Sequence, residues 1–188
     1  MLGIRHCGAT AIDLYQGDIT DFVCDVMVTA ANAALAGGGG IDGAIHQAGG
    51  PAIAAECQRL GGTPTGTAVM TTAGKLPAKK LIHAVGPVWQ GGTHNEASLL
   101  RRSYTASLNL AHEWGARHIA FPAISTGAYG YPHKDAARET MAALCEFLTQ
   151  YPVTTIKRIT LVFMDGDLYR IFQDELFSAF PETERDDH

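Results

Sequence analysis

Short apolar runs alternate along this chain with longer segments in which apolar residues recur every three or four positions, and this alternation constrains the fold most. Five runs have the length and composition of buried strands: 26–28, 67–72, 81–85, 119–121 and 159–163. A sixth candidate contains Ile12 and Leu14, which alternate with polar neighbours as on a strand near a sheet edge. The sequence therefore predicts strands spread over almost the whole chain.

The segments between these runs carry apolar residues at helical spacing, so that each segment has one apolar stripe facing a core. Three series show this pattern: Leu100, Tyr104, Leu108 and Ala111; Ala137, Met141, Leu144 and Leu148; and Leu168, Phe172, Leu176 and Phe180. Strands that alternate with one-faced helices form a sheet that helices cover on both faces. We therefore expect an α/β protein, a three-layer α/β/α sandwich whose ligands sit beyond the carboxyl ends of the strands.

Length and charge limit the domain organisation and the classes of partner. A chain of 188 residues fits one domain. We expect that domain to span residues 1–180 and to be followed by a frayed polar tail at 181–188. The net charge of −5 opposes general nucleic-acid binding, because phosphates need an attracting field. We also expect the protein to be a monomer.

The cysteines and the N-terminus bear on the compartment. Cys7, Cys24, Cys57 and Cys145 form no CxxC pair, which favours free thiols in a reducing compartment. The first residues lack the basic start and apolar stretch of a signal peptide. The longest uncharged stretch contains four consecutive glycines and is unsuited to spanning a membrane. We therefore expect a soluble, cytoplasmic protein with no membrane partner.

The loop after the strand at 26–28 contains four consecutive glycines, Gly37 to Gly40, and Asn32 lies near its start. Glycines let a backbone approach a ligand closely with its N–H groups turned outward. The plainer alternative is a flexible connection, although a short strand-to-helix loop with no serine and no charge is a poor linker. We therefore interpret this loop as part of a binding site.

The helix after the glycine loop should begin near Asp42. Helical spacing predicts that Ile41, Ile45 and Ala48 face the core, whereas Asp42 and His46 are rotated by about 100° and point toward the crevice. Taken alone, Asp42 is explained by a helix N-cap and His46 by a hydrogen-bonded position on the side of a helix. Taken together with the preceding loop, the two polar residues favour a site.

A second loop, 122–132, follows the strand at 119–121 and ends at Pro132, a residue suited to the first turn of a helix. The residues from Ser125 to Tyr129 can then present successive N–H groups near a helix N-terminus, an arrangement that suits a diphosphate. A plain strand-to-helix turn is the alternative. This loop is the second candidate for ligand binding.

Other segments are less specific. Gln16 to Asp21 also follows a strand, and a turn in which Thr20 caps a short helix explains it equally well. The sequence Gly74-Lys75-Leu76 lacks the glycine spacing and the Ser or Thr of a Walker phosphate loop. No GxGxxG motif opens a helix after the first strand, which argues against a hydride-transferring Rossmann enzyme.

Together these motifs resemble the macrodomain family, and within it the MacroD-type branch. The matching stretches lie in family order along nearly the whole chain, at 17–20, 30–32, 37–46, 76–79, 82–87 and 124–132. One departure is visible: this branch commonly has Asn-Ala-Ala-Asn at the strand end, whereas Thr29 fills the first position here. We expect altered packing or hydrogen bonding at Thr29, with Asn32 retained.

The resemblance implies a mixed, mostly parallel sheet of six strands and a cleft for ADP-ribose. Asp18 would accept a hydrogen bond from the adenine amino group, the Ile19 N–H would donate to the ring, and Phe163 would stack on it. Backbone N–H groups would hold the diphosphate, from Ser125, Thr126, Gly127, Ala128 and Tyr129. Neutral donors of this kind explain how a chain of net charge −5 could bind a dianion.

The resemblance also assigns the distal-ribose end of the cleft. Asn32 would bind a ribose hydroxyl and Asp42 would sit beside the reacting end, with His46 supporting Asp42 or the loop. The other side would be closed by Gly38, Gly39, Gly40 and Ile41. Asp42 and Asn32 are accordingly the predicted catalytic residues, and the chemistry needs a positioned water and no cofactor.

The implied activity is hydrolysis of esters at the distal ribose. The substrates would be O-acetyl-ADP-ribose and mono-ADP-ribosylated proteins modified on Asp or Glu, and Asp42 could orient or deprotonate the water. The first alternative is a reader module that binds ADP-ribose without cleaving it. The second is a zinc-dependent macrodomain, but that branch places Cys and His ligands where this chain has four glycines. We therefore predict no metal ligands.

Overall fold

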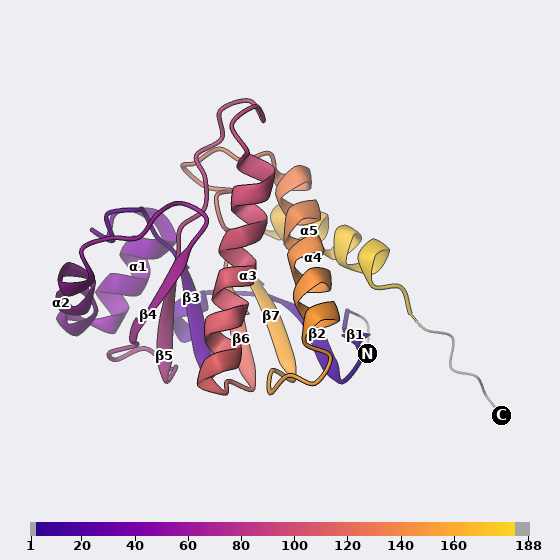
Figure 1. Cartoon of the computed structure of the whole chain (residues 1–188), viewed down its shortest axis with the longest axis horizontal. Coiled ribbons are helices and arrows are strands. Elements are labelled where there is room, and N and C mark those ends of the chain that lie inside the picture. Colours follow the sequence, from indigo (N-terminus) through magenta and orange to yellow (C-terminus); the bar gives the residue numbers. More distant parts are fainter. Residues whose placement is uncertain (1–2, 183–188) are drawn as a thin grey trace.

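The structure is a computed structural model that describes residues 3–182. Its centre is one mixed sheet of seven strands in the order β1-β2-β7-β6-β3-β5-β4 (Figure 1). The strands are β1 (Arg5–Cys7), β2 (Thr10–Gln16), β3 (Val26–Ala30), β4 (Ala68–Thr72), β5 (Lys80–Ala84), β6 (His118–Phe121) and β7 (Arg158–Phe163). The central strands β2, β7, β6, β3 and β5 run parallel, and β1 and β4 pair antiparallel at the two edges. The predicted mixed, mostly parallel sheet is confirmed.

The seventh strand, β1, is the difference from the predicted six. It joins β2 through a tight turn at residues 8–9 and pairs with Arg5 opposite Ile12 and Cys7 opposite Thr10. None of its three residues is fully buried, so no alternation of burial marks it in the sequence. Its place comes from backbone pairing with the edge of β2, which a hydrophobic pattern cannot reveal.

Helices cover both faces of this sheet, which confirms the predicted three-layer sandwich. They are α1 (Gly40–Gly49), α2 (Pro51–Leu60), α3 (Glu96–Trp114), α4 (His133–Gln150) and α5 (Gly166–Ala179), with a short 3₁₀ helix η1 (Ile19–Asp21). The helices α3, α4 and α5 pack in one core with one face of the sheet, and α1 and α2 pack in a second core with the other. Figure 1 shows α3 and α4 in front of the strands.

The two cores follow from alternation along the central strands. On β3, Val26 and Val28 belong to the core under α3 and α4, whereas Met27 between them belongs to the core under α1 and α2. On β5, Ile82 and Leu81 divide in the same way. Because side chains on a strand point alternately to opposite faces, a run without polar residues buries both sides. The three predicted helical stripes are buried except for Leu168, which is half-buried.

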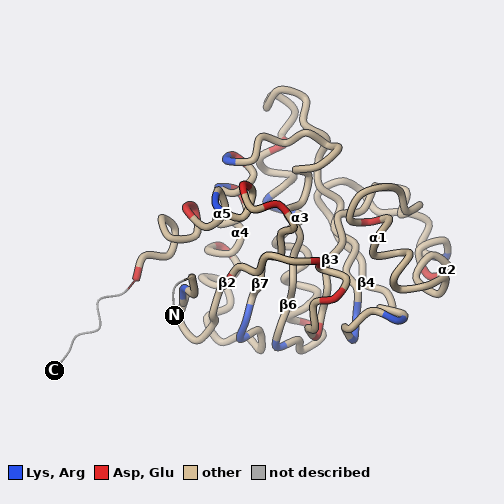
Figure 2. Tube along the Cα trace, turned by 180° about the vertical axis from the view of Figure 1, so that it is seen from behind, with Lys and Arg blue, Asp and Glu red and all other residues tan. Residues whose placement is uncertain are grey.

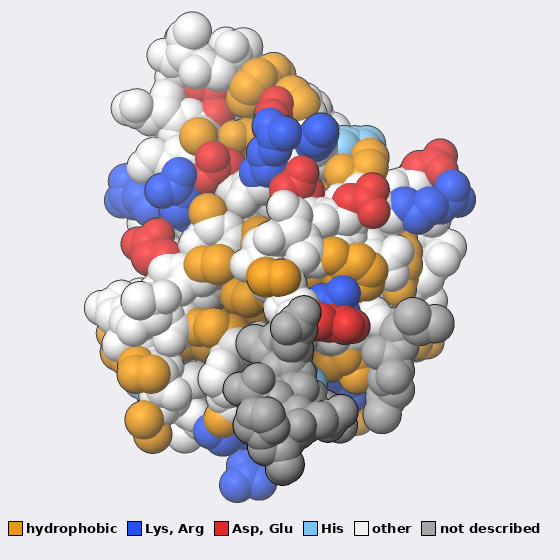
Figure 3. Space-filling view, turned by 90° about the vertical axis from the view of Figure 1, so that its right-hand side faces the viewer, with side chains coloured by type: hydrophobic (Ala, Val, Ile, Leu, Met, Phe, Trp, Pro, Cys, Tyr) orange, Lys and Arg blue, Asp and Glu red, His pale blue; other side chains and the backbone are white. Residues whose placement is uncertain are grey.

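The outer surface of α4 and α5 carries both basic and acidic side chains. Arg138 lies 3.5 Å from Glu175 and 3.8 Å from Asp135, and Arg170 lies 3.5 Å from Asp167. Figure 3, which looks at the side of the molecule bearing α5, shows basic and acidic side chains interspersed there. Such exposed pairs contribute little to stability, each about 0–1 kcal/mol.

Two further expectations concern the ends of the chain and membranes. Of the predicted tail at 181–188, residues 183–188 lie outside the described residues, whereas Glu182 is exposed and its Oε1 lies 3.2 Å from Arg5 Nη1. Among residues 3–182, no helix has the length and apolarity that crossing a membrane requires.

Candidate functional site

A cavity of about 700 Å³ lies beyond the carboxyl ends of the parallel strands. Its walls come from the loops that follow β2, β3, β5, β6 and β7. Parallel strands end at the same edge of a sheet, so loops far apart in the sequence meet there. The cavity therefore lies where the alternation of strands and helices predicts a ligand site.

All but one of the residues predicted for the site line this cavity. They are Asp18, Ile19, Asn32, Gly38, Gly39, Gly40, Ile41, Asp42, Ser125, Thr126, Gly127, Ala128, Tyr129 and Phe163. The exception is His46, which does not line the cavity and instead lies beside Asp42, with its Nε2 3.6 Å from Asp42 Oδ1. The structure thus brings both candidate loops into one pocket.

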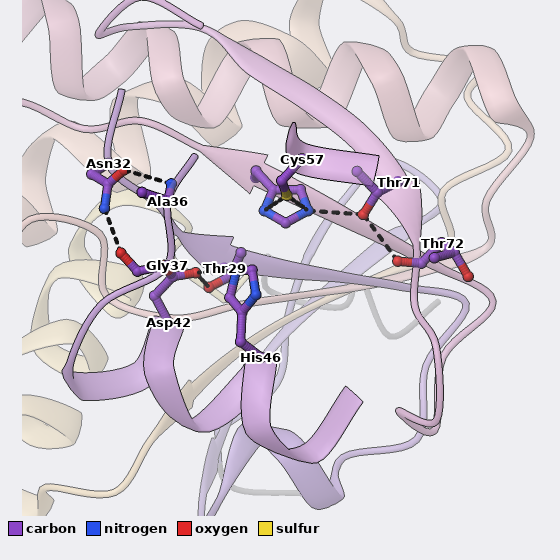
Figure 4. A network of polar contacts seen from close by, with 10 residues as sticks. Thr29, Asn32, Ala36, Gly37, Asp42, His46, Cys57, Thr71 and Thr72 are labelled. Atoms are coloured by element: carbon purple, nitrogen blue, oxygen red, sulfur yellow. Dashed lines mark hydrogen bonds and ion pairs between the residues drawn. The ribbon is translucent and has the colours of Figure 1, made fainter. Parts of the chain in front are cut away.

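Asn32 fastens the glycine loop to the end of β3. Its Nδ2 donates to the Gly37 carbonyl at 2.7 Å, and its Oδ1 accepts from the Ala36 N–H at 3.1 Å (Figure 4). The loop then turns into α1 at Gly40, whose φ of +60° favours glycine. An amide side chain has two N–H donors and two acceptor lone pairs, so Asn32 keeps one of each for a ligand in the cavity.

Asp42 is held by Thr29, the residue that departs from the pattern of the macrodomains that this chain resembles. Its Oδ1 accepts a hydrogen bond from Thr29 Oγ1 at 2.8 Å, and its side chain lines the cavity although the residue is only 7% exposed. Burial raises the pKa of Asp42, while the Thr29 hydrogen bond and the nearby His46 act in the opposite direction. Within residues 3–182, Asp42 Oδ2 has no hydrogen-bond partner. The result is a carboxylate of increased basicity with one oxygen left for a ligand or a water.

The predicted orientation of α1 is wrong in part. Ile45 is fully buried as expected, but Ile41 is 38% exposed at the cavity, and Ala48 is exposed on the outer side of the helix. The buried face instead runs through Asp42, Ile45 and Gly49. Gly49 has room only for a hydrogen there, because Ile53 of α2 packs directly against it. The spacing of apolar residues did not predict the buried face of α1, because Asp42 and Gly49 occupy two of its inward positions.

The turn after β2 is capped by Asp18, which corrects the alternative in which Thr20 is the cap. Asp18 Oδ1 accepts from the Thr20 N–H at 2.9 Å and from the Thr20 hydroxyl at 2.7 Å, so Asp18 is the N-cap of η1. This use of one oxygen fixes the carboxylate at the cavity and leaves its other oxygen for a ligand.

The loop after β6 turns its backbone N–H groups away from internal partners. Among the described residues, the N–H groups of Gly127, Ala128 and Tyr129 have no acceptor. The helix α4 begins at His133, so Pro132 is its N-cap and lies one residue before the first turn in which it was predicted. Ser125 has a φ of +67°, a conformation that L residues rarely adopt, and its buried Oγ also has no partner within residues 3–182. Free N–H groups near a helix N-terminus form a cradle for an anion.

Phe163 lines the cavity but exposes little surface to it. It is 3% exposed, and its ring packs against Phe172 with ring centroids 4.8 Å apart. Most of the ring therefore belongs to the core under α5, and only a small part can meet a ligand.

The cavity contains no cationic side chain. Among the described residues, its lining includes neither Lys nor Arg, and its titratable members are Asp18, Asp42, Asp165, Tyr129 and His133. The basic residues Lys79, Lys80, Arg117, Lys157 and Arg158 lie at or just before the starts of β5, β6 and β7, at the opposite edge of the sheet (Figure 2). An anion in this cavity would thus depend on backbone N–H groups.

Sequence reasoning missed several lining residues. Gly86, Met164 and Asp165 lie within two residues of the ends of β5 and β7, and His133 begins α4. A Cβ at Gly86 would collide with Ser125 Oγ, so a glycine is required for the loop after β6 to lie against β5. The signal that could have found Gly86, Met164 and Asp165 is position alone, because each lies just after a parallel strand.

Comparisons with known proteins agree with this geometry. The family model described as "Macro domain" matches residues 28–140. A macro domain-containing protein of Caldanaerobacter subterraneus is 48% identical, over 88% of this chain and 97% of its own length. A protein of Citrobacter koseri named O-acetyl-ADP-ribose deacetylase is 47% identical, over 86% of this chain and 93% of its own. A solved structure of an Oceanobacillus iheyensis macrodomain with ADP superposes with a TM-score of 0.87 and 34% identity, over 93% of this chain and 94% of its own.

Proposed function

The chain belongs to the macrodomain family, and from this premise we propose that it is a hydrolase that binds ADP-ribose and cleaves esters at the distal ribose. The relative named O-acetyl-ADP-ribose deacetylase supports this reaction, since it resembles nearly the whole chain. The observation that carries the proposal is the order of chemical groups along the cavity, which matches the order of groups in ADP-ribose.

That order follows from the sheet. Along the strands β2, β7, β6 and β3, the cavity presents first Asp18 and Ile19, then Phe163, then the free N–H groups of 127–129, and last Asn32 with Asp42. Three steps between neighbouring strands span about 14 Å. An extended ligand with adenine at β2 would place its diphosphate at the N–H cradle and its distal ribose at Asp42.

The reaction would proceed by attack of water on the ester carbon. Asp42, more basic than an ordinary aspartate because of burial, would orient this water or accept its proton through Oδ2. Thr29 would hold the carboxylate in place through Oδ1, and Asn32 would fix the ribose. The proton would pass to the departing ribose oxygen, so that acetate or a protein carboxylate and ADP-ribose are released. General-base assistance of this kind contributes about 10²–10⁴-fold.

We extend the proposal to proteins that carry mono-ADP-ribose on Asp or Glu. The bond is the same kind of ester, and the cavity opens at the surface, with exposed Ile41 at the Asp42 end. A polypeptide attached to the distal ribose would therefore emerge toward solvent beside Ile41.

The test is a turnover assay with three substrates: O-acetyl-ADP-ribose, a protein with carboxylate-linked ADP-ribose, and one with serine-linked ADP-ribose. We expect release of ADP-ribose from the two esters and none from the serine-linked substrate, because its glycosidic bond offers no carbonyl carbon to attack. A protein that binds ADP-ribose in calorimetry but releases no acetate would instead be a reader module.

A further inference from the structure

A second polar cluster lies next to the cavity but outside it. His46 of α1, Cys57 of α2 and His83 of β5 each offer a ligand atom, and these atoms all lie within 4.8 Å of one another. Cys57 is 1% exposed and His83 is fully buried, and the Cys57 Sγ lies 3.8 Å from His83 Nδ1 and 3.7 Å from His83 Nε2. Figure 4 labels His46 and Cys57 of this cluster, with Thr71 near Cys57. Three metal-ligating side chains from three elements meet here, beside the core that α1 and α2 form with the sheet.

The hydrogen bonds of Thr71 decide which nitrogen of His83 is free. The Thr71 hydroxyl donates to the Thr72 carbonyl at 2.9 Å and lies 2.8 Å from His83 Nε2. Since its one proton is already used, Thr71 Oγ1 accepts from Nε2–H, and the lone pair of the neutral His83 ring is on Nδ1. Histidine ligands of metals commonly donate their other N–H to a fixed acceptor in the same way.

We propose that His46, Cys57 and His83 bind one thiophilic divalent cation of the zinc class. Two imidazoles and a thiolate are preferred ligands of Zn²⁺, with bonds of about 2.0–2.1 Å to nitrogen and about 2.3 Å to sulfur. Ligand atoms around a tetrahedral ion are then about 3.5 Å apart. The observed separations, all within 4.8 Å, require movements of roughly 1 Å, which side-chain rotation can supply.

The charge of the bound cation indicates that Asp42 is the fourth ligand. Asp42 Oδ1 lies 3.6 Å from His46 Nε2, so the carboxylate borders the cluster. On binding, the Cys57 S–H bond breaks, its proton goes to solvent, and a sulfur–metal bond forms. One thiolate and one carboxylate then neutralise the two charges of the cation, which avoids an uncompensated charge in a buried place. The ion would enter past His46, the one partly exposed member of the cluster.

Because the site borders Asp42, we expect a bound cation to inhibit ester hydrolysis. This part of the inference rests on the proposed function. A cation that recruits Asp42 removes it from the water and ribose at the end of the cavity. The protein would therefore hydrolyse its ester substrate slowly when loaded and rapidly after chelation. The site differs from the zinc site of the zinc-dependent branch, because no ligand comes from the glycine loop.

The test is a titration of the reduced protein with Co²⁺, whose thiolate charge-transfer band reports a sulfur ligand directly. We expect one equivalent to bind, with the band displaced stoichiometrically by Zn²⁺. C57S, C57A and H83Q should each abolish the band. The matched control is C24S, because Cys24 is a buried thiol of the same core and should leave the band unchanged.

Three outcomes would overturn the site: no band with the wild type, a band that survives in C57S, or a band lost in a C7S or C145S variant instead. Circular dichroism of each variant identifies misfolding, and the Zn²⁺ displacement on wild-type protein stands whether or not the variants fold. Turnover is measured in the same samples. A Co²⁺ band with unaltered turnover refutes the inhibition alone, whereas a protein inactive even after chelation refutes the proposed function and leaves the titration intact.

Discussion

Two carboxylates of this protein are almost equally buried and behave in opposite ways. Asp42, at the cavity, is 7% exposed and accepts one hydrogen bond, from Thr29. Glu96, at the start of α3, is 1% exposed and accepts from the backbone N–H groups of Gln90, Gly92 and His94. Burial raises the pKa of both groups, but in Glu96 these N–H groups outweigh it and hold the pKa below its usual range, whereas Asp42 keeps a raised pKa.

The difference shows how the number of hydrogen-bond donors distinguishes a carboxylate that stabilises the fold from one that is available for catalysis. Glu96 has donors enough to stabilise its charge, and it holds the loop before α3 in one conformation. Among residues 3–182, Asp42 has a donor to only one of its oxygens, so its charge is costly in the cavity and its second oxygen is available to a ligand. The following variants test this contrast, in order of decreasing effect on turnover.

Asp42→Asn should have the largest effect on catalysis. We expect ester hydrolysis to fall by about 10²–10⁴-fold, because the amide cannot accept a proton from water. Binding of ADP-ribose should remain within a few-fold, since the cradle at 127–129 is untouched. Single-turnover release of acetate and calorimetry with ADP-ribose measure the two effects. Normal turnover would show that Asp42 is not the base.

Asn32→Ala should impair both binding and turnover. It removes the proposed contact with the ribose and the two hydrogen bonds that fasten the glycine loop. Two or three hydrogen bonds of about 1 kcal/mol each give a loss of about 30–150-fold in kcat/KM. Steady-state kinetics would show KM rising as kcat falls. A change in neither parameter would place the ribose elsewhere.

Thr29→Val should lower kcat by about 10-fold and leave ADP-ribose affinity unchanged, because it removes the donor to Asp42 Oδ1 while keeping the shape of the side chain. Thr29→Ser keeps the hydroxyl and is the matched control, with kcat close to that of the wild type. Equal kcat values for the two variants would mean that the Thr29 hydroxyl does not position Asp42.

Glu96→Gln should leave turnover within about two-fold but destabilise the fold. The pKa of Glu96 is lowered in the folded state, so ionisation of Glu96 stabilises the protein above the unfolded pKa of about 4.3 and ceases to do so as the pH falls through the folded value. Urea unfolding should therefore separate the variant from the wild type near pH 7 and bring them together in acid. A separation that grows in acid would contradict this assignment.

The sequence predicted the layers and the loops better than the orientation of individual side chains. The apolar runs of β3 and β5 and the stripes of α3 and α4 are read directly from period, because burial dictates them. The three-residue β1 carries no periodic signal, because backbone pairing defines it. The helix α2 was not predicted, although its buried residues Ile53 and Cys57 lie at helical spacing. The face of α1 was misjudged because a glycine and a carboxylate point inward there.

Contacts between residues far apart in the sequence could not be predicted from sequence patterns. The motif containing Asp42 and His46 is visible in one stretch, but Cys57 and His83 approach it only because α2 and β5 lie beside α1 and β3 in the folded core. Likewise, the hydrogen bond of Thr29 to Asp42 needs the exact setting of α1 against the end of β3, which spacing alone does not give.

The central claim is that one cavity holds ADP-ribose with its distal ribose at Asp42, and a crystal structure of the protein with ADP-ribose tests it most directly. The account predicts adenine beside Asp18, the diphosphate within hydrogen-bond distance of the N–H groups of 127–129, and the distal ribose between Asn32 and Asp42. A ligand bound in the reverse direction, or with its diphosphate away from that cradle, would contradict it.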